Sequence, residues 1–171
     1  MIPVISVVGN SGVGKTTFLE KLVREMKSRG YRLATIKHDV HSFEIDRPGK
    51  DSWRLTQAGS DIVILSSPTR LALLEEMTDD RRLDDLVTMV EDRVDFVLTE
   101  GYRGGAALKI EVSRRAYSPN LTAAVGDLVA IVTDQPFDLE QPQFDLDDAT
   151  GVAELLESKF ALVPRRQPES A

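Results

Sequence analysis

One stretch near the start of the chain decides the fold, and it reads Val4-Ile5-Ser6-Val7-Val8-Gly9-Asn10-Ser11-Gly12-Val13-Gly14-Lys15-Thr16-Thr17. Apolar and β-branched residues dominate its first part, which ends at a glycine and predicts a strand buried on both faces. The part from Gly9 to Thr16 matches the phosphate-binding pattern G-x-x-x-x-G-K-[ST] in full. Apolar residues then recur at helical spacing from Phe18 to Met26. Strand, loop and helix therefore follow in the order that a phosphate-binding loop requires.

The residue types in this loop suit a nucleoside triphosphate. Successive backbone N–H groups must turn inward around the β-phosphate, and glycine reaches the necessary dihedrals at low cost. We expect Lys15 to contact the β- and γ-phosphates, Thr16 to offer its hydroxyl to Mg²⁺, and Thr17 to reach the α-phosphate. The alternative, a glycine-rich helix N-terminus without a ligand, requires a chance match with a probability on the order of 1%. The predicted phosphate-binding residues are Gly9, Asn10, Ser11, Gly12, Val13, Gly14, Lys15, Thr16 and Thr17.

Beyond the loop, predicted strands and helices alternate along the chain. Strands are predicted at residues 32–36, 61–66, 70–74, 96–99, 109–112 and 128–133, and helices at about 51–59, 83–90 and around 152–156. This order predicts an α/β fold of the P-loop NTPase type, with three αβα layers around a mostly parallel sheet. Functional side chains are then expected at the carboxyl ends of the strands. Residues 1–160 are predicted to form one P-loop domain, and residues 161–171 a flexible C-terminal tail.

Composition and charge narrow the function classes. The chain has 171 residues and a net charge of -7, so its surface as a whole repels nucleic acid and anionic lipid. The absence of cysteine excludes disulfides, thiolate zinc sites and iron–sulfur ligation. No basic leader precedes the first apolar run, and no apolar run is long enough to cross a bilayer. We therefore expect a cytoplasmic protein whose anion site is local.

A second strand offers candidate magnesium ligands. Residues 95–101 read Asp95-Phe96-Val97-Leu98-Thr99-Glu100-Gly101, an apolar strand with an acid at each end. Side chains that reach the phosphates must project from the carboxyl end of the strand, which favours Glu100 over Asp95. Magnesium keeps several waters and takes one or two carboxylates, so Glu100 is predicted as a direct or water-mediated partner. A surface acid at a strand end is the alternative interpretation.

The loop after the strand at 32–36 is dense in functional groups. It leaves the same edge of the predicted sheet as the phosphate-binding loop, so Lys37 is a candidate phosphate contact and Asp51 a candidate for the magnesium shell. Solvated loop charges remain the alternative for both residues. His38 and His41 lie three apart without a third ligand of known placement, which disfavours a transition-metal site.

The residues that recognise the base cannot be assigned by the usual motif, because the Asn-Lys-x-Asp guanine element of many GTPases is absent from the chain. Thr133-Asp134 ends the last strongly apolar strand, at about the place in the order of strands where a guanine element is expected. The Asp134 carboxylate is a candidate acceptor for the N1 and N2 donors of guanine. A turn aspartate at a strand end is an equally good interpretation.

Several segments together resemble one family of P-loop proteins. They are residues 9–17, Thr35-Ile36-Lys37-His38-Asp39, Gly49-Lys50-Asp51-Ser52-Trp53-Arg54 with Ala58-Gly59, Thr99-Glu100-Gly101-Tyr102 and Lys109-Ile110-Glu111-Val112. The second and third segments are far more particular than the phosphate-binding loop. On them the chain resembles the molybdopterin-guanine dinucleotide biosynthesis protein B (MobB) family. Leu108 departs from the family pattern, which often has proline there, and this bears on local loop shape.

The resemblance implies a dimeric P-loop GTPase fold that binds GTP with Mg²⁺ and hydrolyses it weakly. It implies a MobA-like guanylyltransferase partner that joins GMP to molybdopterin in molybdenum cofactor synthesis, with molybdopterin as a further candidate ligand. It supports Lys15 and Thr16 at phosphate and metal, and it favours Asp51 and Glu100 as magnesium-side acids. Lys15 and Glu100 are therefore the predicted catalytic residues, in an accessory protein with slow turnover.

Two other functions compete with this expectation. One is a phosphotransferase, a small-molecule kinase whose acceptor would lie near Lys37 and Arg103, although no acceptor pocket is evident from the sequence. The other is a metallochaperone GTPase, which the absence of cysteine and a histidine count of 2 disfavour.

Overall fold

The computed structural model describes residues 2–38, 45–102, 104 and 107–164. The chain divides into two compact units. Unit 1 comprises Met1–His38 and Leu83–Ala171, and unit 2 comprises Asp39–Arg82. The division into two units does not test whether residues 1–160 fold as one domain, so that expectation stays a prediction.

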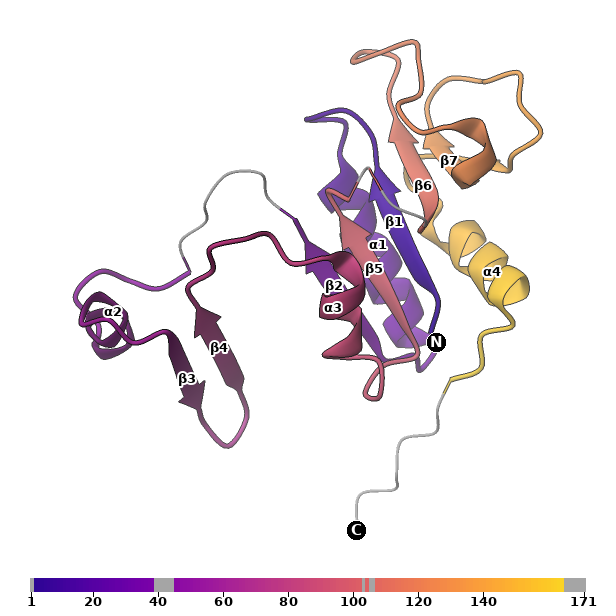
Figure 1. Cartoon of the computed structure of the whole chain (residues 1–171). Helices are drawn as coiled ribbons and strands as arrows, with labels where there is room; N and C mark the ends of the chain where they lie inside the picture. Colours follow the sequence, from indigo (N-terminus) through magenta and orange to yellow (C-terminus); the bar gives the residue numbers. More distant parts are fainter. Residues whose placement is uncertain (1, 39–44, 103, 105–106, 165–171) are drawn as a thin grey trace. The chain divides into compact units, whose positions relative to one another are not determined.

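Unit 1 is built on a parallel sheet of six strands in the order β2-β5-β1-β6-β7-β8 (Figure 1). Its strands are β1 (Val4–Val8), β2 (Leu33–Lys37), β5 (Phe96–Glu100), β6 (Leu108–Ser113), β7 (Leu128–Thr133) and β8 (Gln143–Phe144). Its helices are α1 (Lys15–Ser28), α3 (Leu83–Thr88) and α4 (Ala149–Phe160), with a short 3₁₀ turn at Val125–Asp127. Every neighbouring pair of strands in this sheet is parallel.

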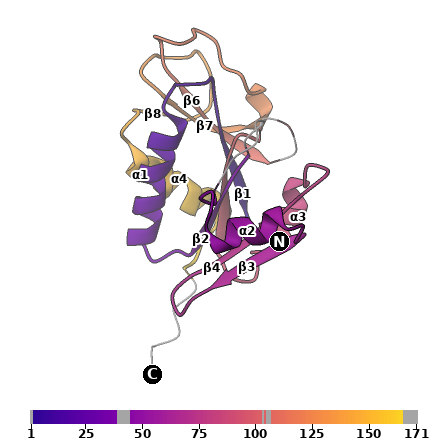
Figure 2. The same cartoon turned by 90° about the vertical axis from the view of Figure 1, so that its left-hand side faces the viewer.

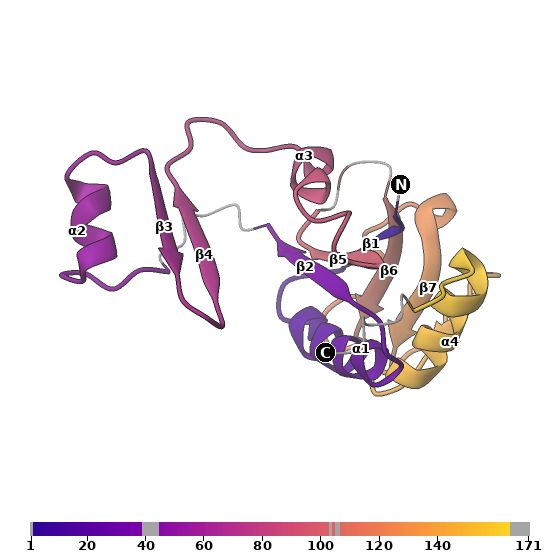
Figure 3. The ribbon, with the colours of Figure 1, turned by 90° about the horizontal axis from the view of Figure 1, so that it is seen from below.

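The helices of unit 1 cover both faces of this sheet. Seen along the layers in Figure 3, α1 and α4 lie on one face and α3 lies on the other. Because helices cover both faces of the sheet, β1 is buried on both sides, as its continuous apolar run predicts. The predicted α/β fold with three αβα layers and a mostly parallel sheet is confirmed.

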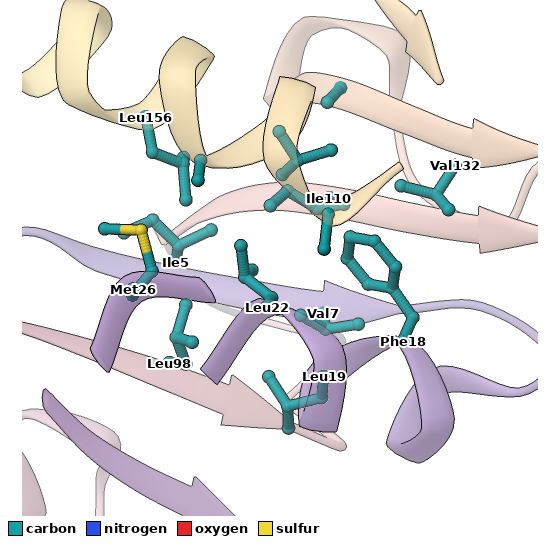
Figure 4. Packing of buried hydrophobic residues seen from close by; sticks show 14 of the residues in the cluster. Ile5, Val7, Phe18, Leu19, Leu22, Met26, Leu98, Ile110, Val132 and Leu156 are labelled. Atoms are coloured by element: carbon teal, nitrogen blue, oxygen red, sulfur yellow. The ribbon is translucent and has the colours of Figure 1, made fainter. Parts of the chain in front are cut away.

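The main core lies between the sheet and the α1–α4 layer. Phe18, Leu22 and Met26 repeat every four residues, so they lie on one stripe of α1 that faces the sheet. In Figure 4, Leu22 and Met26 lie near Ile5 of β1, and Phe18 lies toward Val132 of β7. From α4, Leu156 closes the same cluster. A smaller cluster on the opposite face joins Val87, Val94 and Val97. Both faces of the central strands are therefore sealed.

Most predicted elements of unit 1 differ from the observed ones by a residue or two. The helix after the phosphate-binding loop ends with Gly30 in the left-handed region at φ 89°, just past its C-cap Arg29, as a C-terminal glycine predicts. The sequence did not indicate β8, which begins directly after Pro142. Two residues of strand pair with β7, too few to produce a readable apolar alternation.

The segment predicted as a tail begins at residue 161. Leu162 packs against the core, and its carbonyl accepts a hydrogen bond from the hydroxyl of Tyr31 at 3.0 Å. Residues 165–171 lie outside the described part of the chain.

Unit 2 consists of α2 (Asp51–Gln57) and an antiparallel hairpin of β3 (Ile62–Ser66) and β4 (Leu71–Glu75). Figure 2 shows the helix beside the hairpin, and α2 contacts β3. The two strands form a sheet of their own, so this part of the expected strand–helix alternation does not belong to the parallel sheet. The pairing register places Ile62, Ile64, Leu71 and Leu73 on one face, and all four side chains are exposed.

Across the described ranges of both units, no helix combines the length and apolar character that crossing a bilayer requires.

Candidate functional site

The phosphate-binding loop connects the carboxyl end of β1 to the amino end of α1. Gly9 has φ 137°, and a Cβ atom there would lie 2.2 Å from the carbonyl oxygen of Val112, so the loop passes β6 too closely for any side chain. Gly14 is the N-cap of α1 at φ 98°, in the left-handed region. These positions explain physically why the sequence pattern requires glycine. The amino end of a 14-residue helix faces the loop and attracts anions.

The side chain of Lys15 folds back over this loop. Its Nζ donates to the carbonyl oxygen of Gly9 at 3.2 Å and to that of Asn10 at 2.8 Å. The ammonium group therefore lies against the loop itself, at the place where the phosphates of a nucleotide are expected.

Thr16 and Glu100 meet at the loop, although 84 residues separate them. The Thr16 hydroxyl donates to the Glu100 carboxylate, at 3.0 Å from Oε1 and 2.9 Å from Oε2. The pair arises because β1 and β5 are parallel neighbours in which Val7 is the register partner of Glu100. A hydroxyl and a carboxylate are both oxygen donors of the kind that Mg²⁺ prefers, so this pair fits that ion. In the described part of the chain, no group of three or more His, Cys, Asp and Glu is arranged to hold a metal.

Asp95 occupies the other end of the same strand. Its carboxylate accepts from the backbone N–H of Arg32 at 2.7 Å and from Nη2 of Arg32 at 3.3 Å. Asp95 therefore links β2 to β5 at the edge of the sheet away from the phosphate-binding loop. The sequence favoured Glu100 over Asp95 because Glu100 follows the carboxyl end of the strand, and the structure has the two acids at these opposite ends of β5.

Lys37 lies at the phosphate edge of the sheet. It is the last residue of β2 and the register partner of Glu100. The chain continues to His38, whose backbone N–H donates to the carbonyl of Glu100 at 2.8 Å and whose ring lies 4.9 Å from that of Tyr102. His41 and Arg103 lie outside the described residues.

Asp51 belongs to unit 2, where it is the first residue of α2. Its side chain is 98% exposed and lies 3.8 Å from Nη1 of Arg54, one helical turn later. Within its own unit, Asp51 is a solvated acid at a helix start.

The carboxyl ends of β6 and β7 lead to Asp134, which the sequence predicted as a base contact, and to Arg114, which sequence reasoning missed. Ser113 and Thr133 are register partners, so the residues that follow them, Arg114 and Asp134, leave neighbouring strands at the same edge. Nε of Arg114 donates to the carbonyl of Val13 in the phosphate-binding loop at 2.8 Å. Asp134 Oδ1 accepts from the backbone N–H of Arg115 at 2.8 Å. A pair of arginines directly after a predicted strand was the signal available in the sequence.

Further polar contacts hold these strand ends in place. Gln135 donates through Nε2 to the hydroxyl of Ser113 at 3.2 Å and to the carbonyl of Ser118 at 2.9 Å. Glu111, buried on β6, accepts from the backbone N–H and hydroxyl of Thr122 at 2.6 and 2.9 Å. The segment between β6 and β7 is thus anchored at several points.

The loop before α4 carries an ion pair near this edge. Lys21 of α1 donates to the carboxylate of Asp147. This hydrogen bond and the charge of Lys21 lower the pKa of Asp147, and the positive charge of Arg114 lowers it a little further.

The parallel sheet with its helices and the glycine-rich loop between β1 and α1 define an α/β protein of the P-loop NTPase-like class. Comparison with known families narrows this class, because residues 4–134 match the family model for molybdopterin guanine dinucleotide synthesis protein B, MobB. The chain belongs to the MobB family, as its sequence motifs had indicated.

Individual relatives agree with this assignment. The chain is 34% identical over 158 residues to the molybdopterin-guanine dinucleotide biosynthesis adapter protein of Haemophilus influenzae, covering 92% of this chain and 89% of that protein. It is 34% identical over 161 residues to the adapter protein of the same name from Escherichia coli, covering 91% and 92%. The crystal structure of Bacillus subtilis MobB superposes with a TM-score of 0.75 at 26% identity, covering 93% of this chain and 98% of that one.

Proposed function

We propose that this protein is a GTP-binding adapter in the synthesis of molybdopterin guanine dinucleotide. The observation that carries the nucleotide part is the arrangement at the loop, where Lys15 lies over the loop carbonyls and the Thr16 hydroxyl meets the Glu100 carboxylate. Membership of the MobB family and the names of the relatives, which are adapter proteins of this pathway, support the pathway part.

Each predicted residue has a role in this proposal. The backbone of residues 9–17 cradles the phosphates, and Lys15 neutralises charge on the β- and γ-phosphates. Thr16 and Glu100 would hold Mg²⁺, and Asp51 is the further acid proposed for the metal. Lys37 contacts phosphate from β2, and Asp134 accepts from the guanine N1 and N2 donors. Bound magnesium would neutralise the negative charge that develops on the phosphates during hydrolysis.

Slow turnover follows from the groups that the chain does not supply beside Glu100. Efficient GTPases orient the attacking water with a dedicated side chain, often a glutamine, and stabilise the transition state with an arginine finger. Here Glu100-Gly101 is followed by Tyr102, and no glutamine stands nearby in the sequence. We therefore assign weak intrinsic GTPase activity, well below the median enzyme turnover of about 10 per second.

The proposed assembly has two kinds of partner. A MobA-like guanylyltransferase receives the nucleotide-dependent assistance, and molybdopterin is its substrate. A second copy of this chain is the other partner, because the exposed apolar face of the β3–β4 hairpin requires cover that unit 2 does not provide. The proposed location of this assembly is the cytoplasm.

Calorimetric titration of the purified protein with GTP and with ATP, each with and without magnesium, tests the nucleotide part. We expect tighter binding of GTP than of ATP, and binding that strengthens with magnesium. Binding of neither nucleotide would refute the P-loop assignment, and equal binding of both would refute the guanine assignment.

Phosphate release with and without the guanylyltransferase tests the adapter part. We expect slow release by the protein alone, a rise in turnover or cofactor maturation when the partner is added, and loss of that rise in Lys15→Ala. Fast release by the isolated protein, or equal stimulation of Lys15→Ala, would instead indicate an autonomous enzyme.

A further inference from the structure

The chain that follows β6 runs beside the phosphate-binding loop. β6 is a parallel neighbour of β1, and Val8, the last residue of β1, is the register partner of Glu111 (Figure 1). Both strands therefore end at the same edge of the sheet, and the loop that leaves β1 passes the end of β6. Gly9 makes the first contact between them, against the backbone of Val112.

A tight turn of residues 114–118 follows directly after β6. The backbone N–H groups of Tyr117 and Ser118 donate to the carbonyl of Arg114 at 2.9 and 3.2 Å. Gln135, which follows β7, donates through Nε2 to the carbonyl of Ser118 at 2.9 Å and to the hydroxyl of Ser113 at 3.2 Å. The turn is thus closed by its own backbone and tied to the neighbouring strand end, so it forms a support beside the loop.

Two side chains of this turn lie against three consecutive residues of the loop. Cε1 of Tyr117 lies 2.8 Å from the position that a Cβ atom would take at Gly12. Nε of Arg114 donates to the carbonyl of Val13 at 2.8 Å, and its Nη2 lies 3.4 Å from the Cβ position at Gly14. The Val13 side chain is buried in the main core. Val13 is therefore held by its side chain on one side and by its carbonyl on the other.

The contact to Val13 fixes the orientation of one peptide unit. In a trans peptide the C=O and the N–H point in opposite directions, and the described residues contain no cis peptide bond. Because Nε of Arg114 holds the Val13 carbonyl, the N–H of Gly14 points away from Arg114. This peptide precedes the hydrogen bonds of α1, since Gly14 is the N-cap and its own carbonyl accepts from the N–H of Phe18 at 2.9 Å. Arg114 thus orients a peptide that the helix itself does not orient.

Glycine makes the orientation of this peptide easy to change. A flip reverses the Val13 carbonyl and the Gly14 N–H through ψ of Val13 and φ of Gly14. Gly14 has φ 98°, and glycine adopts positive and negative φ at similar cost. A flipped peptide would present a carbonyl oxygen in place of the N–H, and a carbonyl oxygen repels an anion. An external contact that selects one orientation therefore favours anion binding.

We propose that Arg114 is a positioning residue, which holds the Val13 carbonyl and so keeps the N–H of Gly14 turned toward the phosphates of a bound nucleotide. This inference rests on the proposed function, in which the backbone of residues 9–17 cradles the phosphates. Arg114 strengthens binding because the loop is ordered before the ligand arrives. It acts through the loop backbone, by a hydrogen bond and not by its charge.

Two substitutions separate the hydrogen bond of Arg114 from its charge. Glutamine carries Nε2 the same number of bonds from the backbone as Nε of arginine, so Arg114→Gln keeps a donor for the Val13 carbonyl without the charge. Arg114→Met keeps the length of the side chain but has neither donor nor charge. A role through charge, including a direct contact of the guanidinium with phosphate, predicts equal losses in both variants. A positioning role predicts a loss in Arg114→Met that Arg114→Gln largely avoids.

The first measurement is Kd for GTP and for GDP, each with magnesium, by calorimetry. We expect Kd to rise about tenfold in Arg114→Met and to stay within about threefold of the wild-type value in Arg114→Gln. The rise should agree within about twofold for GTP and GDP, because both carry the β-phosphate that the loop cradles. Arg115→Met is the matched control, since it changes an exposed neighbour whose contact to Asp134 runs through the backbone, and it should keep the wild-type Kd.

The second measurement is the backbone amide signal of Gly14 in proton–nitrogen correlation spectra of the nucleotide-free protein. This signal reports the orientation of the Val13–Gly14 peptide without any ligand. It should shift or broaden in Arg114→Met and keep its wild-type position in Arg114→Gln and Arg115→Met. Signals from β6 and β7 should stay in place in all three variants, which excludes a general loss of structure.

Arg114→Ala repeats the donor-free measurement if the methionine variant does not fold. Wild-type affinity in the donor-free variants, or an equal loss in Arg114→Gln, would overturn the inference and leave the proposed function intact. An unaltered Gly14 signal in a donor-free variant that binds weakly would indicate a direct contact with the nucleotide and would also overturn the inference alone. Binding of neither GTP nor ATP by the wild-type protein would overturn the proposed function and this inference together.

Discussion

The two units of this chain use the same apolar residue types in opposite ways. In β1 of unit 1, Ile5 and Val7 are 0% exposed, because helices cover the sheet on both faces. In the hairpin of unit 2, Ile64 and Leu71 are 60% and 69% exposed. A parallel sheet between helices completes its own core, whereas a hairpin with one short helix cannot. Unit 1 thus buries its apolar residues within itself, whereas unit 2 leaves the apolar face of its hairpin exposed.

The chemistry follows the same division. The phosphate-binding loop, Glu100, Lys37 and Asp134 all belong to unit 1, and Asp51 is the one predicted site residue in unit 2. The comparison therefore bears on function, because nucleotide binding is expected to depend on unit 1, while the role of Asp51 stays a prediction.

The largest expected effect is on stability, and it distinguishes the buried apolar residues of unit 1 from the exposed ones of unit 2. Leu22→Ala removes a fully buried side chain of α1 and should lower the free energy of unfolding by about 2 to 5 kcal/mol at every protein concentration. Leu71→Ala makes the same chemical change on the open hairpin face. Its effect should appear only at concentrations where the proposed homodimer forms.

Circular dichroism follows the helices and strands of both units together, and fluorescence of Trp53, the only tryptophan of the chain, follows unit 2 because it lies in α2. If Leu71→Ala loses stability as strongly as Leu22→Ala in the dilute monomer, the hairpin face is covered within one chain and the two units do not differ in this respect.

Removal of the loop lysine comes next in size. Lys15→Ala deletes a charge-assisted contact to phosphate, so GTP binding with magnesium should weaken by about 2 kcal/mol or more, measured by calorimetry. Lys159→Ala removes the same charge from the last turn of α4 and should leave affinity unchanged. Wild-type affinity in Lys15→Ala would place nucleotide binding outside the unit 1 loop.

The magnesium shell offers a direct comparison of the two units. Glu100→Gln and Asp51→Asn each remove a negative charge expected beside the cation, and affinity measured over a magnesium series should lose roughly tenfold of its metal dependence. The loss should be larger for Glu100→Gln, whose carboxylate already meets Thr16. Asp95→Asn is the control, since Asp95 pairs with Arg32 at the opposite edge of the sheet. If both test variants keep the wild-type dependence, the metal is held elsewhere; if Asp51→Asn alone keeps it, unit 2 supplies no ligand.

The smallest effect concerns alkaline stability of unit 1. Burial raises the pKa of Tyr31 above its ordinary value of 10.0, and the Glu157 carboxylate adds to the shift. A group whose folded pKa is raised stabilises the fold fully below its unfolded pKa, and this contribution is lost as pH rises through the folded pKa. The unfolding free energy should therefore decline from about pH 10 upward. Tyr31→Phe should show a shallower decline in denaturant titrations, and an unaltered slope would contradict this assignment.

Local patterns were enough to predict much of unit 1. The apolar run before Gly9 and the four-residue repeat of Phe18, Leu22 and Met26 encode β1 and α1 through short-range geometry. Parallel strands present their carboxyl ends at one edge, and Glu100 lies at that edge beside Thr16, while its role as a magnesium ligand stays a prediction. For unit 2 the sequence predicted two strands but not that they form a separate hairpin, because the spacing of apolar residues does not indicate which sheet a strand joins.

Sequence alone thus determined the phosphate-binding loop with its flanking strand and helix, because these depend on residues close together in the chain, and it indicated the family through several short motifs. Only the tertiary structure decided that Thr16 meets Glu100 across 84 positions and that Arg114 reaches Val13 across 101. Both contacts depend on the order of strands in the sheet, with β5 on one side of β1 and β6 on the other. That order arises from packing of the whole sheet against its helices, which no short segment of sequence encodes.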